Sequence, residues 1–313
     1  RNARSFYLGY RYFRKYYADD LGPELAQWEH KLRDFSGVCF SSARSHDESL
    51  SQHAFGGSLN CLVDIALMEP GWAGDFFASG RAQRMGDRCI AICNNMGQTV
   101  MLGDTNPTDY PSVLFAKLGY YYRDGRYWFM IDKRGRTKTT GDEAMRGFAT
   151  GVEPTLPEDH IGLRVIPADE LYMTTALRTT NGVTTETGFD KLAFREGFDP
   201  DDEYLMIDGV SGGGHAYEDA NSIGEFSAHG RRWLCEIDVF NGPTMGFHNA
   251  VTVARDGLGS PDLPQAAELV AQASGDGYAY AATRLPGYNG MDWTRHTLWM
   301  PGAHTFVLDE LVA

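Results

Sequence analysis

The spacing of apolar residues changes once along this chain of 313 residues, and the change limits the folds that it can form. In the first half, apolar residues recur at steps of three and four, the period of a helix with one buried face. In the second half they occur in short runs bounded by turn-forming residues, a pattern typical of β-strands in a sandwich. The sequence therefore predicts a helical region followed by an antiparallel sheet region.

The boundary between the two regions falls where periodicity is weakest. Residues 133–167 are rich in glycine and proline and show little periodicity, so we place the domain connection there, between regions 1–150 and 151–313. We expect helices over 6–17, 21–35, 50–68, 76–94 and 112–122. We expect strands over 171–177, 191–195, 204–208, 248–254, 268–273, 278–284, 294–300 and 304–311, and two more joined by a turn at His229–Gly230.

Composition excludes several classes of partner. Lys and Arg total 28 against 42 Asp and Glu, a formal net charge of -14, which argues against nucleic acid because phosphate binding needs a basic surface. An acidic substrate would have to meet a local basic patch. No apolar run is long enough to span a membrane. The five cysteines lack CxxC spacing, so neither a metal knuckle nor a full disulfide framework follows, and we interpret Cys89 and Cys93, one helical turn apart, as small buried groups.

The richest cluster of polar residues lies between Gly209 and Ala250. Four glycines, at positions 209 and 212–214, allow sharp turns or close approach of the backbone. His215, Tyr217 and Asp219 follow at once, and Asp238 and His248 come after the two predicted strands. Antiparallel strands return to the same end of a sheet, so we expect these polar groups to gather at one end.

This stretch resembles the C-terminal sandwich of the heparinase II/III family of polysaccharide lyases. The resemblance rests on His215-Ala-Tyr217-Glu-Asp219-Ala-Asn221-Ser222, followed by Ile237-Asp238 and His248-Asn249-Ala250-Val251. Gln52-His53 in a predicted helix and Asp109-Tyr110-Pro111-Ser112 at the start of another are similar to family motifs in order and spacing, as is the segment Tyr288–His296. The resemblance covers most of the chain. It implies an incomplete (α/α) toroid over 1–150, truncated at its N-terminus, and a large antiparallel β-sandwich over 151–313, truncated at its C-terminus.

The resemblance also implies an activity and a set of site residues. Such enzymes cleave a uronic-acid-containing polysaccharide by β-elimination and leave a 4,5-unsaturated uronate. His53, Tyr110 and His215 then occupy catalytic positions, and Gln52, Arg81 and Tyr217 are candidates for binding the substrate. Because Tyr110 precedes a proline that begins a helix, we expect it at the helix mouth, off the packed wall. Whether His53 or Tyr110 is the base stays open.

The family resemblance implies a metal, often zinc, held by a histidine at the place of Tyr217, by Asp238 and by His248. A phenol is a poor zinc ligand beside imidazole, so Asp238 and His248 are the matched positions here. A zinc ion is therefore one expectation for this end of the sheet. A hydrogen-bonded polar end without an ion is the other.

Two other functions remain open at the level of sequence. One is a glycoside hydrolase, which needs two facing carboxylates and would draw on Asp47, Glu48, Asp104 and Asp109. The other is a non-catalytic carbohydrate-binding protein. For the lyase, the expected partner is an acidic polysaccharide or oligosaccharide of glycosaminoglycan or alginate type, and the resemblance implies a periplasmic or secreted enzyme.

Overall fold

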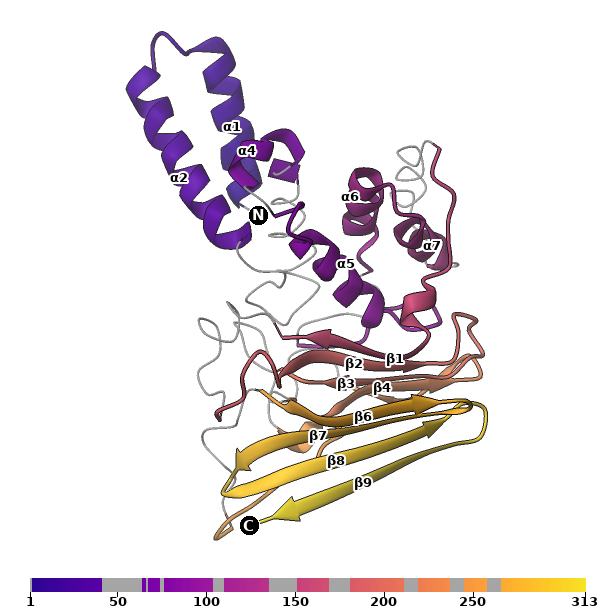
Figure 1. The fold of residues 1–313 in the computed structure, drawn as a ribbon. Coiled ribbons are helices and arrows are strands. Elements are labelled where there is room, and N and C mark those ends of the chain that lie inside the picture. Colours follow the sequence, from indigo (N-terminus) through magenta and orange to yellow (C-terminus); the bar gives the residue numbers. More distant parts are fainter. Residues whose placement is uncertain are drawn as a thin grey trace.

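The architecture is a layer of helices over two stacked antiparallel sheets (Figure 1). The computed structural model describes residues 2–40, 64–65, 67–73, 76–103, 110–134, 151–168, 181–210, 219–236, 245–257 and 266–313. The helices are α1 (Asn2–Tyr16), α2 (Gly22–Phe40), α4 (Pro70–Ala73), α5 (Arg81–Ala91), α6 (Ser112–Tyr122) and α7 (Gly125–Lys133). None of the helices in this part of the chain is long and apolar enough to cross a membrane.

The strands form two sheets of consecutive antiparallel neighbours. The first has the order β1-β2-β3-β4-β5, with β1 (Gly162–Pro167), β2 (Phe189–Arg195), β3 (Tyr204–Asp208), β4 (Ile223–Ala228) and β5 (Arg231–Cys235). The second has the order β6-β7-β8-β9, with β6 (Glu268–Gly275), β7 (Tyr278–Tyr288), β8 (Met291–Met300) and β9 (His304–Val312). Short 3-10 turns occur at η3 (Glu158–His160) and η4 (Met245–Phe247).

The first sheet is the central layer, because β2 and β3 are buried along their whole length. Side chains alternate between the two faces of a strand. Ala193 and Met206 pack into the core beneath α5, α6 and α7, whereas Leu192 and Ile207 pack against the second sheet. One hydrophobic core therefore lies between the helical layer and the first sheet, and a second lies between the two sheets.

A buried arginine joins α5 to the first sheet. Arg195, the last residue of β2, is fully buried and donates to the carbonyls of Ile90 (3.3 Å) and Cys93 (2.7 Å) at the C-terminal end of α5. Carbonyls in the last turn of a helix have no partner inside the helix and attract a cation. The guanidinium also lies 4.3 Å from the ring centre of Phe198 and 4.5 Å from that of Tyr204.

The first helices have a core of their own. Tyr7 and Tyr10 of α1 pack against Leu25 and Leu32 of α2 and against Trp72 of α4. The two tyrosine hydroxyls are also engaged, one with Glu69 at 3.1 Å and the other with Glu29 at 2.6 Å. Each polar tip is thus satisfied while its ring is buried.

Most of the expected elements are confirmed where the structure describes them, with three differences. The helix expected over 76–94 is shorter, because residues 76–80 form turns and α5 begins at Arg81. The strand expected over 248–254 is wrong, since those residues form bends and loop held by the side chain of Asn249, which donates to the carbonyls of Ile223 (2.9 Å) and Cys235 (3.2 Å). Helix α7 and strand β1 lie inside or beside the stretch interpreted as the domain connection and were not expected. The expected helix 50–68 and strand 171–177 fall largely or wholly outside the described residues.

Candidate functional site

Strand direction brings a set of charged residues to one end of the first sheet. In the antiparallel order, β2 begins where β3 ends, and β4 begins where β5 ends. Lys191 at the start of β2 pairs in register with Asp208 at the end of β3, and Glu236 directly follows β5. Segment 211–218, which carries His215 and Tyr217, begins shortly after Asp208 in the sequence and lies outside the described residues.

A chain of ion pairs crosses this end of the sheet. Arg88 of α5 donates through Nε to Asp190 Oδ2 at 2.7 Å, and both side chains are at most 5% exposed. Lys191 Nζ lies 3.2 Å from Asp190 Oδ1 and also bonds to Asp208 Oδ1. Asp208 Oδ1 accepts a further bond from the amide of Val210 at 3.0 Å. Buried charges of this kind persist only when they are paired.

Next to this chain lies a buried carboxylate–imidazole pair. Glu236 Oε2 bonds to Nδ1 of His248, and its other oxygen accepts from the hydroxyl of Ser222 at 3.2 Å. Burial raises the pKa of Glu236, although its bond to His248 lowers it. Burial alone would lower the pKa of His248, but Glu236 and Asp219 raise it overall. The pair therefore favours an imidazolium beside a carboxylate.

Asp219 is the least satisfied group of the cluster. Its side chain is fully buried, and within the described residues neither of its oxygens has a hydrogen-bond partner. Burial, together with the nearby charge of Asp208, raises the pKa of Asp219 to about 8. Four carboxyl groups of the cluster, Asp190, Asp208, Asp219 and Glu236, face three cations, Arg88, Lys191 and protonated His248. The charges balance when Asp219 holds a proton or when another cation is bound.

A second network holds the cluster in place from the other sheet. Arg295 of β8 donates from one nitrogen to the carbonyls of Asn221 and Asn249, both at 2.9 Å, and its remaining nitrogens bond to Asp309. Thr283 of β7 donates to the side-chain oxygen of Asn221 at 2.6 Å. These contacts make segment 288–296 an aromatic corner with a satisfied arginine, since Trp293 also donates to Asp309 at 2.8 Å.

The structure places three of the eight predicted site residues. His248 lies in the cluster just described, and Arg81 is the first residue of α5, partly exposed. Arg88, on the same face of α5, is buried against Asp190 and is not available to a substrate. Tyr110 is the third, at the start of α6. The other five, Gln52, His53, His215, Tyr217 and Asp238, lie outside the described residues.

Tyr110 lies at the start of α6, as expected, but its side chain is not off the packed wall. It is 7% exposed and belongs to the core beneath the helices. Its hydroxyl donates to the carbonyl of Met130 in α7 at 2.7 Å, and burial raises its pKa well above the usual value. The charge of Arg195, at the opposite end of β2 from Lys191, acts on this phenol. The described structure therefore does not bring Tyr110 together with His248.

Another group of metal-ligand type is already occupied by an arginine. Ligand atoms of Asp87, Asp159 and His160 lie within 4.8 Å of one another. Arg126 NH1, however, lies 2.7 Å from Asp159 and 3.5 Å from Asp87, so the guanidinium supplies the positive charge there. We therefore interpret the group as an ion-pair network between α7, α5 and the segment before β1.

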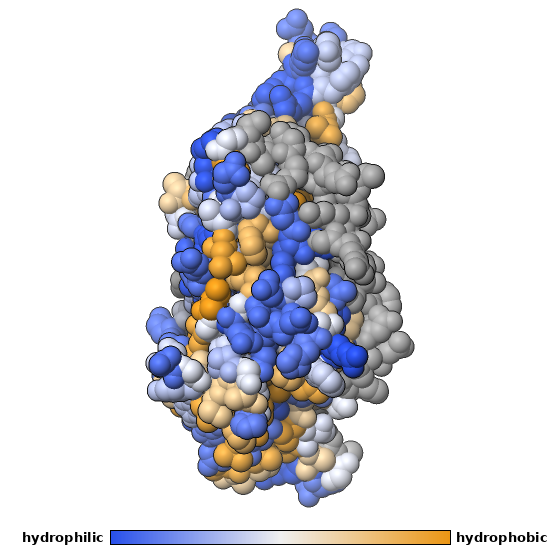
Figure 2. Space-filling model, turned by 90° about the vertical axis from the view of Figure 1, so that its right-hand side faces the viewer, coloured by the Kyte–Doolittle hydropathy of each residue, from blue (hydrophilic) through white to orange (hydrophobic). Residues whose placement is uncertain are grey.

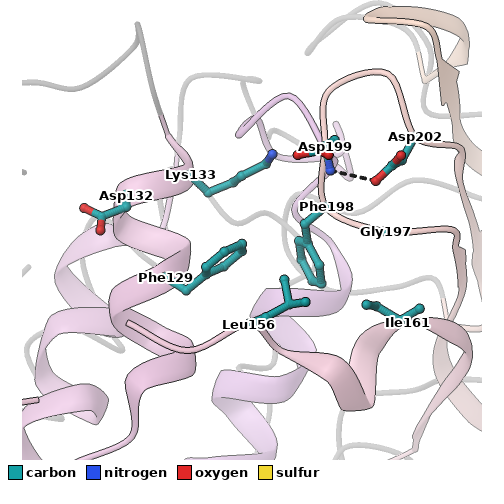
Figure 3. Close-up of a pocket in the computed structure, with 9 residues that line it drawn as sticks. All are labelled: Phe129, Asp132, Lys133, Leu156, Ile161, Gly197, Phe198, Asp199 and Asp202. Atoms are coloured by element: carbon teal, nitrogen blue, oxygen red, sulfur yellow. Dashed lines mark hydrogen bonds between the residues drawn. The ribbon is translucent and has the colours of Figure 1, made fainter. Parts of the chain in front are cut away.

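An open hollow of about 510 Å³ lies at the other end of the first sheet, between α7, the segment before β1 and the β2–β3 turn. Phe129, Leu156, Ile161 and Phe198 form its apolar lining, and the amine of Lys133 reaches toward Asp199 (Figure 3). Figure 2, which views the molecule from this side, shows apolar surface between polar areas. Because the loop after β3 leaves from the opposite end, this hollow is not part of the charged cluster.

Sequence reasoning missed most of the charged cluster. Asp219 was part of the quoted motif but was given no role, and Glu236 was passed over beside Asp238. Lys191 is only the first residue of an expected strand, and Asp190 lies just before that strand. Their signal was the adjacent opposite charges at the start of an otherwise apolar strand, since charges are rarely buried unless paired.

The fold defines a class of protein in which helices pack on an antiparallel β-sandwich. Solved structures of this kind are similar to the chain over nearly its whole length. They include heparinase III (TM-score 0.62, 12% identity, 95% of this chain and 45% of that one) and a mutant of heparan sulfate lyase HepC from Pedobacter heparinus (0.58, 14%, 94% and 43%). A third is the BT4657 gene product, described as heparinase III (0.61, 13%, 99% and 44%).

The structural likeness confirms the expected resemblance at the level of fold. No family model matches the sequence, and no curated protein matches it. The chain spans less than half the length of the enzymes to which it is similar. At these identities the likeness establishes architecture, and activity has to be argued from the site.

Proposed function

We propose that the chain belongs to a polysaccharide lyase that cleaves a uronic-acid-containing polysaccharide by β-elimination. The observation that carries the proposal is the buried cluster of Asp219, Glu236 and His248, built at the sheet end from which the His215 segment departs. The similarity of the fold to heparan sulfate lyases supports it. On this proposal, helices α1–α7 belong to an incomplete (α/α) toroid and the two sheets to a truncated sandwich.

The reaction removes the proton at C5 of a uronate and expels the oxygen at C4 of the same ring. Removing that proton places a second negative charge beside the carboxylate, so the site must neutralise it. In the proposal, Gln52 donates hydrogen bonds to the carboxylate and His53 stabilises the enolate-like intermediate. One well-placed donor of this kind lowers the barrier by about 3 to 4 kcal/mol.

Proton transfer falls to histidine and tyrosine in this proposal. The raised pKa of Tyr110 keeps its phenol protonated at neutral pH, which suits an acid that protonates the leaving oxygen and not a base. In the conformation described, that hydroxyl donates to Met130, so catalysis requires exchange of this bond for one to substrate. His53 then removes the C5 proton, while His215, Tyr217 and Arg81 bind the sugar.

The residues at the sheet end suit a cation. A metal-bound histidine usually gives its other ring nitrogen to a carboxylate, and Glu236 holds Nδ1 of His248 in that way. Asp219 supplies a buried carboxylate without a hydrogen-bond partner in the described residues. We propose His248, Asp238 and Asp219 as ligands of a zinc ion. When bound, zinc would supply positive charge at this end of the sheet.

Metal content of the full-length protein, measured by mass spectrometry after dialysis, tests this part. We expect about one zinc per chain, and chelation should lower the unfolding temperature because the ion binds only the folded state. Absence of bound metal, with no effect of chelation, would leave the proton on Asp219 as the balancing charge.

The lyase proposal is tested by incubating the full-length protein with heparan sulfate, chondroitin sulfate and alginate. Elimination produces the ultraviolet absorbance of a 4,5-unsaturated uronate. New reducing ends without that absorbance would indicate a glycoside hydrolase, and binding without either would indicate a carbohydrate-binding protein. The partner is an acidic polysaccharide, and a substrate of that size fits a periplasmic or secreted enzyme, which fractionation of cells would test.

A further inference from the structure

Trp233 on β5 is unusual among the tryptophans of this chain. The sequence has six tryptophans, and Trp72, Trp128, Trp293 and Trp299 are buried while Trp28 is partly buried. Trp233 is 56% exposed. An exposed indole leaves an apolar ring in water beside a polar N–H, a combination that is enriched at interfaces.

Trp233 has no cross-strand partner in the pairing of β5 with β4. Ser227 of β4 pairs with Arg232 and Phe226 with Leu234, so Trp233 is an extra residue in β5, at a β-bulge. Bulges re-aim side chains and occur preferentially at sheet edges and near active sites. β5 is an edge strand of the first sheet. The indole is also anchored, because its Nε1 donates to the carbonyl of Ala228 at 3.1 Å.

A free guanidinium accompanies the indole. Ala228, whose carbonyl accepts from the indole, is the cross-strand partner of Arg231, so the indole and Arg231 meet the same residue of β4. Arg231 is exposed and makes no ion pair within the described residues. Its neighbour Arg232 is turned the other way, bonding to Glu225 and to the carbonyl of Thr99. In a chain of formal charge -14, Arg231 is therefore a local basic group available to a ligand.

The location connects this pair to the charged cluster. β5 runs from Arg231 to Cys235, and Glu236 follows directly. Three residues of extended strand separate Trp233 from Glu236, roughly 10 Å at the usual rise per residue. The exposed indole is therefore close along the strand to the buried cluster, whose own side chains are covered.

We infer that Trp233 and Arg231 form a subsite for an acidic polysaccharide, in which the indole packs on the apolar face of a sugar ring and the guanidinium binds a carboxylate or sulfate. Arg recognises such planar or tetrahedral anions through paired N–H donors, and Trp with Arg is a frequent combination in binding sites. The inference rests on the proposed function for the identity of the polymer. The subsite itself needs no cleavage.

Binding of a heparan sulfate octasaccharide to the full chain, followed by tryptophan fluorescence and by calorimetry, tests the inference. We expect saturable quenching that dextran does not produce. Trp233→Ala should remove most of the quenching and weaken binding by about tenfold, the effect of one good aromatic contact. Arg231→Gln should also weaken binding and reduce its dependence on salt.

Matched variants guard against general effects on folding or charge. Tyr120→Ala removes an aromatic side chain that is 60% exposed on α6, and Lys15→Gln removes an exposed cation of α1; both should bind normally. Unchanged affinity in Trp233→Ala, or no binding of any acidic polysaccharide, would overturn the subsite. If Trp233→Ala binds with unchanged affinity and the protein still forms unsaturated product, the subsite is contradicted and the lyase proposal is supported. Specific binding that depends on Trp233, without any unsaturated product, would support the subsite and contradict the lyase proposal.

Discussion

The hydroxyl of Tyr110 has both a structural partner and a proposed catalytic role, and one substitution separates them. Tyr110→Phe removes the bond to Met130 and should lower the free energy of unfolding by about 1 kcal/mol. If the phenol is the acid, the rate of elimination should fall by at least about a hundredfold. Chemical denaturation and the ultraviolet assay measure the two effects, and an activity loss of only a few fold would assign Tyr110 to the core alone.

The buried carboxyl of Asp219 makes stability depend on pH. Its pKa is about 8 in the folded protein, above the ordinary value for aspartate of about 3.9. Between these values the unfolded chain has lost the proton that the folded protein keeps, so stability is greatest at low pH and falls as pH rises. Asp219→Asn cannot ionise and should lack this contribution.

Thermal unfolding of the wild type and of Asp219→Asn at several pH values from about 5 to about 8 checks this. We expect the unfolding temperature of the wild type to fall relative to the variant as pH rises. A difference that stays constant across this range would mean that Asp219 is not the group responsible. These measurements use metal-free protein, so that a bound ion does not hide the pH dependence due to Asp219.

At this scale the sequence motif contained Asp219 and His248, and the other charged members of the cluster could not be predicted. The motif around His215 and the position of His248 follow from sequence, since strand ends meet in an antiparallel sheet. The roles of Glu236 and Lys191 depend on which partner lies across the strand, and this is set by register. The burial of Tyr110 depends on how α6 packs against α7, which the pattern around a proline does not specify.

Helix α5 is fixed to the sheet by Arg195, and we expect this contact to be costly to remove. Arg195→Met keeps much of the volume but removes the guanidinium that donates to the carbonyls of Ile90 and Cys93, and among the described residues only the carbonyl of Ile90 retains a second donor, the amide of Cys93. Burial lowers the pKa of Arg195, and no carboxylate pairs with it in the part of the chain that the structure describes. The helix-end carbonyls and the two aromatic rings therefore stabilise this cation.

We expect Arg195→Met to lower the free energy of unfolding by about 3 kcal/mol, as for other buried polar groups that lose a partner. Arg33→Met on α2 is the control, because its ion pair with Glu29 is half exposed and should contribute about 0.5 kcal/mol or less. Urea unfolding followed by circular dichroism measures both. Equal effects of the two substitutions would contradict the proposed role of Arg195.

At the level of elements, sequence predicted the strands well where short apolar runs are bounded by turn-forming residues, as in β2, β3 and β6 to β9. It failed for α7, whose sequence Gly-Arg-Tyr-Trp-Phe-Met-Ile-Asp-Lys has apolar residues in a continuous run and no clear period. It also failed for β1, a strand of intermediate burial in a glycine- and proline-rich stretch. Both elements depend on tertiary contacts more than on local pattern.

The whole molecule contains cores of different size, and this predicts unequal protection from hydrogen exchange. The core of α1, α2 and α4 involves few buried side chains, whereas β2 and β3 lie between two larger cores. Amides of α1 and α2 should exchange through local opening, faster than those of β2 and β3, which should need global unfolding. Mass spectrometry of peptides after exchange measures this, and equal protection throughout would show a single cooperative unit.

The division into regions 1–150 and 151–313 stays a prediction, and the shared core beneath α5, α6 and α7 bears on how it should be understood. A cut near residue 150 would separate these helices from the sheet face on which Ala193 and Met206 pack. Expression of 151–313 alone would therefore expose an apolar face to water and favour aggregation. Designs for shorter fragments do better to begin ahead of α5.

Because β2 is buried completely, neither face of the strand is free to accept a different side chain. Even-numbered positions such as Leu192 and Phe194 serve one interior and Ala193 serves the other, so an inserted residue would exchange the two sets. Phenylalanine and leucine would then be forced into the space that alanine fills under the helices. Natural variants should consequently accumulate insertions in the turns on either end of this strand, and sequence change inside it should come as paired, compensating replacements.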